Sequence, residues 1–429
     1  MKKSYLKQCK QWVKKVFPFS VKLYDKIAEW KYRMLFLFSF LMWRQPRVFQ
    51  RIKQKVLVQG KKIRVGFFVM ENEKWACQTL YDKLKEHPNF EPVILLSSLN
   101  LENHELLQEK FYKNLAFFKR VCGDVIEVYD PQRHLFHSLE PYNLDIVFYE
   151  QPWSIAKEQN PYAISKFALS CYIPYCFEEG YEMIKRNYWL FQVWLYRKYI
   201  SHNIIKKHYQ KQGYKRNNMY VVGYPKMEHY LIPVSNKKKY VIYAPHHSVD
   251  EGSVLHGTFS WNGFFLLKYA KQNPQFNWVF KPHPRCKISL LKAGLFKNRQ
   301  ELENYYKQWA TIGQVCEEGN YMELFRETKC LITDCISFLV EFFPTQQPVI
   351  HLRRTDSWDT PLVAEQIIPT YYSVFDLSTL ENTLHTVLEE GKDPMYQTRS
   401  AKLRELELAL PSSDRIICDF EGSFLKEDK

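Results

Sequence analysis

From residue 61 onward, short apolar runs alternate with longer stretches in which apolar and polar residues are mixed. In the first half of the chain, apolar runs occupy residues 62–70, 91–98, 124–130, 144–150, 171–177 and 219–225. Runs of this length that are rich in Val, Ile, Phe and Tyr predict buried strands. The stretches between them predict helices at residues 73–86, 102–119, 154–168 and 181–212.

The alternation is interrupted at residues 231–239, which are polar, contain Pro233 and predict a linker. A second series follows, with strands predicted at residues 239–245, 276–283, 329–334 and 348–352. Helices are predicted at residues 258–272, 286–311, 320–328, 335–343 and 378–408.

This order of strands and helices predicts an α/β protein, because alternating strands and helices form parallel sheets that are covered on both faces. We expect two Rossmann-like, doubly wound domains, at residues 61–230 and 240–408, followed by a C-terminal tail at residues 409–429. In open α/β sheets, ligands bind outside the carboxyl ends of the strands. A cleft between the two domains is therefore the expected binding site.

The net charge of +15 is concentrated at the N-terminus, where residues 1–62 hold 17 Lys and Arg but only Asp25 and Glu29. Residues 1–60 mix these cations with Trp, Phe and Leu, and we interpret them as a basic amphipathic arm. Its most apolar part, residues 34–43, is far shorter than the roughly 20 residues that span a bilayer. We expect peripheral contact with an anionic membrane; the alternative is a helical hairpin packed on the body. Since the remainder is neutral, no nucleic-acid partner is expected.

Several common sites have no motif in this sequence. No GxGxxG follows the first strand, and no GxxxxGK[ST], GxSxG, HExxH, CxxC or Asp-x-Asp occurs. These absences argue against a nicotinamide site, a P-loop, a nucleophile elbow, a zincin, a zinc ribbon and a carboxylate-held metal–diphosphate. We therefore expect neither a metal nor a cofactor, and an activated phosphate must be held by cations, hydroxyls and backbone N–H groups.

The first candidate site is Lys281-Pro282-His283-Pro284-Arg285, which follows a predicted strand at the expected cleft. Prolines on both sides of His283 restrict the backbone and hold the imidazole in one direction. With Lys281 and Arg285, it predicts a cationic, hydrogen-bonding pocket for a diphosphate. The alternative is a stiffened turn with a solvated histidine.

The second candidate site lies where another apolar strand ends, at Thr333 and Asp334. Both residues are natural N-caps for the helix that follows. The first helical turn offers backbone N–H groups and the Ser337 hydroxyl, which is typical of a phosphate site. An ordinary capped helix is the alternative. We expect the two strand ends to be adjacent in one sheet, so that His283 and this helix start converge on one pyrophosphate.

Three segments together resemble the C-terminal domain of the bacterial CDP-glycerol glycerophosphotransferases, which make teichoic-acid and capsular polymers. The segments are YAPHH (243–247), KPHP (281–284) and LITDCISFLVEFF (331–343), the last followed by QPVI (347–350). Cys335 and Ile336 depart from the family pattern. The matching residues are Lys281, His283, Pro284, Thr333, Asp334, Ser337 and Glu341.

The resemblance implies a GT-B type fold that binds the nucleotide donor on its second domain. In such enzymes an acceptor hydroxyl attacks the phosphate that bears glycerol, and CMP leaves. Glu341 would then accept hydrogen bonds from ribose hydroxyls. His246 and His247, after the first strand of this domain, are further donor-binding candidates, with a satisfied turn as the alternative. The implied partners are CDP-glycerol or another activated donor and a lipid-linked or oligosaccharide acceptor, in the cytoplasm at the inner face of the bacterial membrane.

The acceptor side departs from the family, whose members carry a His-Gly as general base in the N-terminal domain. No His-Gly precedes residue 231 here, and FYEQPW (148–153) and PYCFEEGY (174–181) occupy the corresponding region. Glu178 and Glu179 follow a predicted strand, and a buried carboxylate there would take the acceptor proton. A solvated loop is the alternative.

Two other functions remain open from the sequence. The acidic-acidic-Gly element Glu178-Glu179-Gly180, together with KPHP and Ser337, also resembles the bacterial sialyltransferases of GT-B fold. That resemblance implies CMP-sialate or another nucleotide sugar as donor. The departures at Cys335 and Ile336, and the missing His-Gly, favour instead an inactive GT-B scaffold in a polysaccharide-synthesis complex.

Overall fold

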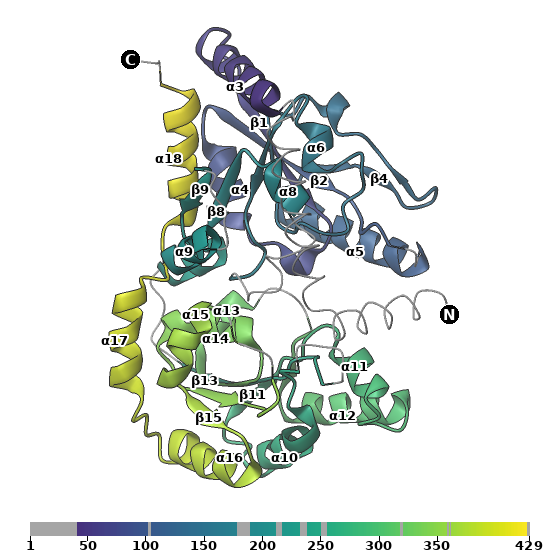
Figure 1. The fold of residues 1–429 in the computed structure, drawn as a ribbon. Helices are drawn as coiled ribbons and strands as arrows, with labels where there is room; N and C mark the ends of the chain where they lie inside the picture. Colours follow the sequence, from purple (N-terminus) through teal and green to yellow (C-terminus); the bar gives the residue numbers. More distant parts are fainter. Residues whose placement is uncertain are drawn as a thin grey trace, which may run out of the picture.

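Two parallel sheets, one in each half of the chain, form the framework of the protein (Figure 1). The first has seven strands in the order β3-β2-β1-β6-β7-β8-β9, and the second has six in the order β12-β11-β10-β13-β14-β15. The computed structural model describes residues 41–101, 104–177, 189–211, 217–231, 238–249, 255–317, 321–357, 360 and 362–426. Residues 1–40 of the predicted arm lie outside the described residues, as do Glu178 and Glu179.

The first sheet matches the strands that the sequence predicts and adds β8. Its strands are β1 (Ile63–Val69), β2 (Phe90–Leu96), β3 (Val125–Glu127), β6 (Ile146–Tyr149), β7 (Leu169–Tyr172), β8 (Arg197–Ile200) and β9 (Met219–Val221), with a separate hairpin of β4 (Tyr129–Asp130) and β5 (Leu135–Phe136). The helices of this half are α3 (Leu41–Leu57), α4 (Gln78–Glu86), α5 (His104–Val121), α6 (Pro161–Ile164), α8 (Trp189–Val193) and α9 (Asn203–Lys211).

The second sheet has helices on both sides. Its strands are β10 (Tyr240–Ala244), β11 (Asn277–Phe280), β12 (Gln314–Val315), β13 (Thr328–Thr333), β14 (Val349–Leu352) and β15 (Tyr372–Val374). The helices of this half are α10 (Phe259–Gln272), α11 (Cys286–Lys292), α12 (Arg299–Ile312), α13 (Met322–Arg326), α14 (Ile336–Phe342), α15 (Leu362–Ile367), α16 (Leu377–Leu384) and α17 (Tyr396–Leu406).

Alternate residues of each central strand enter opposite cores, which explains why the strands are apolar throughout. On β1, Val65 and Phe67 pack with α4 and α5, whereas Phe68 packs on the opposite face. On β10, Val241 and Tyr243 alternate with Ile242 and Ala244 in the same way. A parallel sheet buried on both faces is the result, as the apolar runs predict.

Two predicted helices are wrong. Residues 154–168 contain only the short α6, and the predicted helix at 181–212 contains strand β8 between α8 and α9. The hydrophobic pattern does not predict this strand because β8 contains Arg197 and Lys198, and cations are unusual in a buried strand. Lys198 is fully buried, with Nζ 3.2 Å from the ring centroid of Tyr209, so an aromatic face compensates part of its desolvation.

The two halves share one continuous apolar cluster, which joins them. Phe177 and Tyr224 of the first half pack in the same cluster as Ile242 and Leu339 of the second. The linker between the sheets carries a 3₁₀ helix, η3 (Pro225–Leu231), whose Met227 is fully buried in this cluster.

Residues 409–429, which the sequence assigns to a tail, contain helix α18 (Ser412–Phe424), and this helix packs on the first sheet beside α4 and β9 (Figure 1). Phe420 is fully buried against strands of that sheet. Asp419 accepts hydrogen bonds from Arg197 at 3.0 Å and from the Tyr199 hydroxyl at 2.7 Å. The C-terminus therefore returns to the N-terminal half.

The described part of the N-terminal arm, α3, also packs on the first sheet. Val48, Ile52 and Val56 are buried in its core, and Lys55 forms an ion pair with the buried carboxylate of Asp145. The apolar face of α3 from Val48 to Val56 is thus covered by the protein. None of the described helices has both the length and the apolar character that crossing a membrane requires.

Candidate functional site

The candidate site lies at the carboxyl edge of the second sheet, where β11, β10 and β13 end side by side. The expectation that KPHP and Thr333-Asp334 follow adjacent strands is wrong, since β10 pairs with both β11 and β13 and separates them. The end of β10 carries His246 and His247, which therefore occupy the space between the two motifs. Sheet order depends on the path of the crossover connections, and the local pattern of residues does not encode that path.

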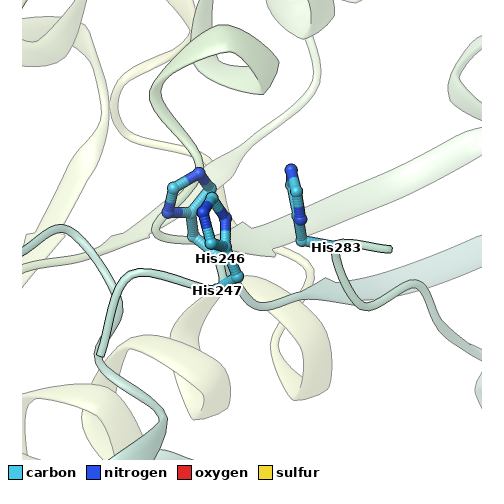
Figure 2. A group of neighbouring side chains, drawn as sticks. All are labelled: His246, His247 and His283. Carbon is cyan, nitrogen blue, oxygen red and sulfur yellow. The ribbon is translucent and has the colours of Figure 1, made fainter. Parts of the chain in front are cut away.

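His246, His247 and His283 form a cluster in which one ring nitrogen from each lies within 4.8 Å of the others (Figure 2). The His247 and His283 rings stack with centroids 4.1 Å apart, and the His246 and His283 centroids are 5.1 Å apart. His256 lies next to this group, 6.3 Å from His246 between ring centroids. All four side chains are half-buried. By spacing alone, the three imidazoles of the cluster suit either one anionic group or one transition-metal ion.

Asp334 organises the loop that carries two of these histidines. Its carboxylate is buried and accepts hydrogen bonds from the His246 backbone N–H at 2.6 Å, the Thr258 N–H at 2.6 Å and the Thr258 hydroxyl at 2.7 Å. Burial raises the pKa of Asp334 to about 6, and these hydrogen bonds oppose the rise. The carboxylate thus holds both ends of the loop between residues 246 and 258.

Thr333 also has a structural contact, because its hydroxyl donates to the Ala244 carbonyl at 2.6 Å and accepts from the Cys335 N–H at 3.0 Å. Ser337 is half-buried on the first turn of α14, with its hydroxyl 3.4 Å from the Cys335 sulfur. Thr333 and Asp334 therefore stabilise the backbone around the site. The Ser337 hydroxyl is more exposed than either of them.

Lys281 connects the histidine cluster to α14. Its ammonium lies 5.0 Å from the ring centroid of Tyr321 and 5.9 Å from that of Phe338, a residue of α14. Only 4% of Lys281 is exposed, and burial lowers its pKa. Arg285, four residues later, is exposed at the start of α11. The structure therefore places the lysine of KPHP near Phe338 in the first turn of α14, and the convergence of His283 and this helix start on one pyrophosphate stays a prediction.

The pKa values of three of the four histidines are lowered. Burial, followed by the charge of His247, lowers the pKa of His283 to about 3, and burial lowers the pKa of His256 to about 4. The pKa of His246 is also well below its ordinary value, from burial first and then from neighbouring His247. At neutral pH these three rings are uncharged. Lys281, whose pKa is itself lowered by burial, and Arg285 are the lysine and arginine whose charges act on His283.

Glu341 lies apart from the cluster, in the interior between the two halves. Its carboxylate is 1% exposed and accepts hydrogen bonds from the Tyr321 hydroxyl and the Phe177 backbone N–H. Burial raises its pKa, while Lys226 on η3 opposes this. The side chain thus joins η3, α14 and the end of the first domain.

Glu150, directly after β6, is a carboxylate that the sequence motifs did not indicate. It is buried at the carboxyl edge of the first sheet and accepts a hydrogen bond from the Ala76 N–H at 2.7 Å. Burial raises its pKa to about 7, against the opposing effects of the Ala76 N–H and Lys226. β6 neighbours β1, where the strand order of the sheet reverses, and ligands bind at such a reversal. The sequence did offer one signal for this residue, because the apolar run at 144–150 ends in an acidic residue.

Lys226 relates Glu150 to the second half of the protein. It is half-buried on η3, its charge acts on both Glu150 and Glu341, and its ammonium lies 5.2 Å from the ring centroid of Tyr321. Lys281 approaches the same ring. A band of charged groups therefore runs from Glu150 across the domain junction to KPHP.

Comparison with solved structures gives matches over most of this chain. TagF, a wall teichoic acid polymerase soaked with CDPG, matches with a TM-score of 0.53 and 12% identity, covering 94% of this chain and 100% of its own. UDP-GlcNAc 2-epimerase from Neisseria meningitidis, bound to UDP-GlcNAc, matches with a TM-score of 0.54 and 13% identity, covering 84% and 100%. MnaA from S. aureus, solved with UDP, matches with a TM-score of 0.52 and 12% identity, covering 86% and 99%.

Comparison with protein-family models gave no match, and comparison with curated protein sequences gave none either. At 12–13% identity, the similarity to these solved structures concerns the fold. The prediction of fold class is confirmed: two parallel sheets with flanking helices make this chain a two-domain α/β protein of GT-B type.

Proposed function

We propose that this protein is a transferase of bacterial surface-polysaccharide synthesis that moves glycerol phosphate from CDP-glycerol to an acceptor hydroxyl. The observation that carries the proposal is the meeting of His246, His247 and His283 at the carboxyl edge of the second sheet, beside Lys281. Imidazole N–H groups and an ammonium are donors suited to the oxygens of a diphosphate. The resemblance of these segments to CDP-glycerol glycerophosphotransferases supports the choice of donor.

In the proposed reaction, the oxygen of an acceptor hydroxyl forms a bond to the phosphorus that bears glycerol. The bond between that phosphorus and the bridging oxygen breaks, and CMP leaves with the electron pair. His283, His246 and Lys281 would stabilise the charge that develops on the diphosphate oxygens. The acceptor proton passes to a carboxylate of the first domain.

Glu150 is our proposed proton acceptor from the described residues, because a pKa near 7 suits a general base at neutral pH. Glu178 and Glu179 remain proposed candidates for the same role. Replacing each of the three by Gln separates them, since only the base should lose turnover by roughly 10²–10⁴. If Glu150 is the base, the wild-type rate should also rise with pH up to about 7, and this rise should be absent from Glu150→Gln.

The donor is tested by thermal-shift titration of the full chain with CDP, CMP, UDP and GDP, followed by an assay of CMP release from CDP-glycerol. A nucleotide at 100 times its Kd should stabilise the protein by about 2.7 kcal/mol. His283→Ala should lose this shift, while the control His385→Ala, an exposed histidine far along the chain, should keep it. A preference for UDP or for a CMP-linked sugar would replace CDP-glycerol as donor. No shift with any nucleotide would overturn the proposal in favour of an inactive scaffold.

We also propose that residues 1–40 attach the enzyme to the inner face of the membrane, because much of the basic excess lies there and Val48, Ile52 and Val56 of α3 are already covered by the first domain. Sedimentation with vesicles of anionic and of neutral lipid tests this. The full chain should sediment with anionic vesicles only, and a chain lacking residues 1–40 with neither. Equal sedimentation of both chains would contradict the assignment.

A further inference from the structure

Two histidines of the cluster meet the protein backbone through the same ring nitrogen. The Ser248 N–H points at His246 Nδ1 across 3.3 Å, and the Arg285 N–H points at His283 Nδ1 across 3.1 Å. A backbone N–H group can only donate a hydrogen bond. Each Nδ1 must therefore be the acceptor nitrogen of its ring.

The buried hydroxyl of Ser248 adds a second constraint on His246. Its oxygen lies 2.7 Å from His246 Nδ1 and accepts hydrogen bonds from the backbone N–H groups of His256 at 3.0 Å and Gly257 at 3.3 Å. The Gly257 N–H is shared with the Ser248 carbonyl at 3.1 Å. Because both N–H groups point at the hydroxyl oxygen, its hydrogen is left for His246 Nδ1. The hydroxyl thus acts as a donor to the same nitrogen as the backbone does.

A neutral imidazole carries its proton on one nitrogen, so an accepting Nδ1 leaves the proton on Nε2. A second proton on Nδ1 would face the N–H groups of Ser248 or Arg285 directly. The backbone therefore disfavours the doubly protonated ring independently of burial.

We propose that His246 and His283 bind the anionic group of the donor as uncharged Nε2–H donors, and that Ser248 is the positioning residue that holds His246 in this tautomer. The identity of the anion as a diphosphate rests on the proposed function. The tautomer does not, because it follows from contacts within the protein.

This arrangement distinguishes an anion site from a metal site in the same cluster. A metal bound at Nε2 needs that nitrogen unprotonated and the ring proton on Nδ1, where a carboxylate, a backbone carbonyl or water normally accepts a hydrogen bond from it. Here Nδ1 of His246 and of His283 faces donors instead. The ring spacing would accommodate zinc, but the hydrogen-bond partners of two of the three rings oppose it.

The groups that face these rings are His247, His256, Lys281, Arg285 and Asp334. Burial raises the pKa of Asp334 to about 6, so it titrates at the acid end of this range, but it contacts the backbone of His246 and not its ring. Because the two rings bind as neutral donors, the affinity for CDP should not increase between pH 8 and pH 6 through their protonation. An imidazolium clamp would gain affinity over the same range.

The direct test is ¹⁵N NMR of the full chain labelled at histidine, with the signals assigned from single His→Gln variants among its 13 histidines. We expect an unprotonated Nδ1 and a protonated Nε2 for His246 and His283 throughout pH 6–8, without added nucleotide. Ser248→Ala loses the hydroxyl donor but keeps the backbone N–H, so the His246 signals should move only part of the way toward the other tautomer, while those of His283 stay unchanged. A protonated Nδ1 on either wild-type ring would overturn the proposal.

Two substitutions at His283 test the same idea through binding. A Gln amide places its N–H close to the position of imidazole Nε2, whereas an Asn amide reaches only the position of Nδ1. We expect His283→Gln to weaken CDP binding less than about fivefold and His283→Asn more than about tenfold, as for one lost hydrogen bond to a charged group. Equal losses in both variants would contradict a neutral donor at Nε2.

Equilibrium dialysis with Zn²⁺ completes the comparison. The wild-type chain should retain no zinc that depends on His283, and one equivalent lost in His283→Ala would overturn the proposal. If wild-type protein binds no nucleotide, the proposed function fails, yet the NMR result still decides the tautomer. The two failures are thereby distinguishable.

Discussion

The backbone N–H of His246 donates to Oδ1 of Asp334 across 2.6 Å, so the residue that directly follows β13 fixes the first residue of the histidine cluster. The other carboxylate oxygen receives the Thr258 N–H and hydroxyl. This one side chain therefore determines where both ends of the loop after β10 lie, and through them where the histidine rings stand.

Asp334→Asn should destabilise the protein by about 1–3 kcal/mol, because the new amide faces at least one N–H donor and leaves it unsatisfied in the interior. CDP binding should fall as well, since the loop loses its anchor. Urea denaturation and CDP titration at pH 7 measure both effects. Asp414→Asn is the control, because that carboxylate lies in an exposed ion pair with Lys83 and should change little. If the Asp334→Asn variant bound CDP as tightly as the wild type does, the loop would not need this anchor.

Glu150 makes the stability of the first domain depend on pH. Its pKa is raised from 4.5 to about 7 in the folded chain, so the folded state binds more protons between these values than the unfolded state. Stability from this group is therefore highest below pH 4.5, falls as the pH rises to about 7, and is constant above. The full effect is about 3 kcal/mol.

Glu150→Gln removes this dependence, because the amide does not titrate. Urea midpoints of wild type and variant should therefore change relative to one another between pH 5 and pH 7.5, with the variant gaining on the wild type as the pH rises. A difference that stays constant over this range would mean that Glu150 is ionised throughout.

Arg399→Met should cost about 3–5 kcal/mol, since it leaves a buried ion pair without its cation. The guanidinium is fully buried, pairs with Asp393 and donates to the carbonyls of Gln346 at 3.0 Å and Thr370 at 3.3 Å. These contacts hold α17 on the second domain. Arg404→Met, on an exposed position of the same helix, is the matched control and should shift the thermal midpoint little.

Phe420→Ala should destabilise the first domain by about 3–5 kcal/mol by opening a cavity under α18. The ring is fully buried and lies 5.7 Å from Phe148 and 6.2 Å from Tyr199 between centroids. Glu421→Ala removes only a partly exposed contact with His87 and should cost less than about 1 kcal/mol. Limited proteolysis should then cleave the Phe420 variant near α18 first. Equal protease resistance of both variants would indicate that α18 contributes little.

Local sequence determined the parts of this protein that depend on neighbouring residues only. The apolar runs at residues 62–70 and 329–334 predicted β1 and β13, because a strand buried on both faces must be apolar throughout. The same reasoning missed β8, where Lys198 is compensated by Tyr209 from another element. The prolines beside His283 likewise indicated a fixed imidazole at a strand end, because their restriction of the backbone is local.

The tertiary structure alone decided the order of strands and the state of the buried polar groups. β10 lies between β11 and β13, which brings His246 and His247 to His283 from 36 or more positions earlier in the chain. The raised pKa of Glu150 needs Ala76, Lys226 and burial together, and the tautomer of His283 needs the Arg285 N–H to point at its ring. These properties depend on distances between groups far apart in sequence or on the exact direction of a turn, and a one-dimensional pattern carries neither.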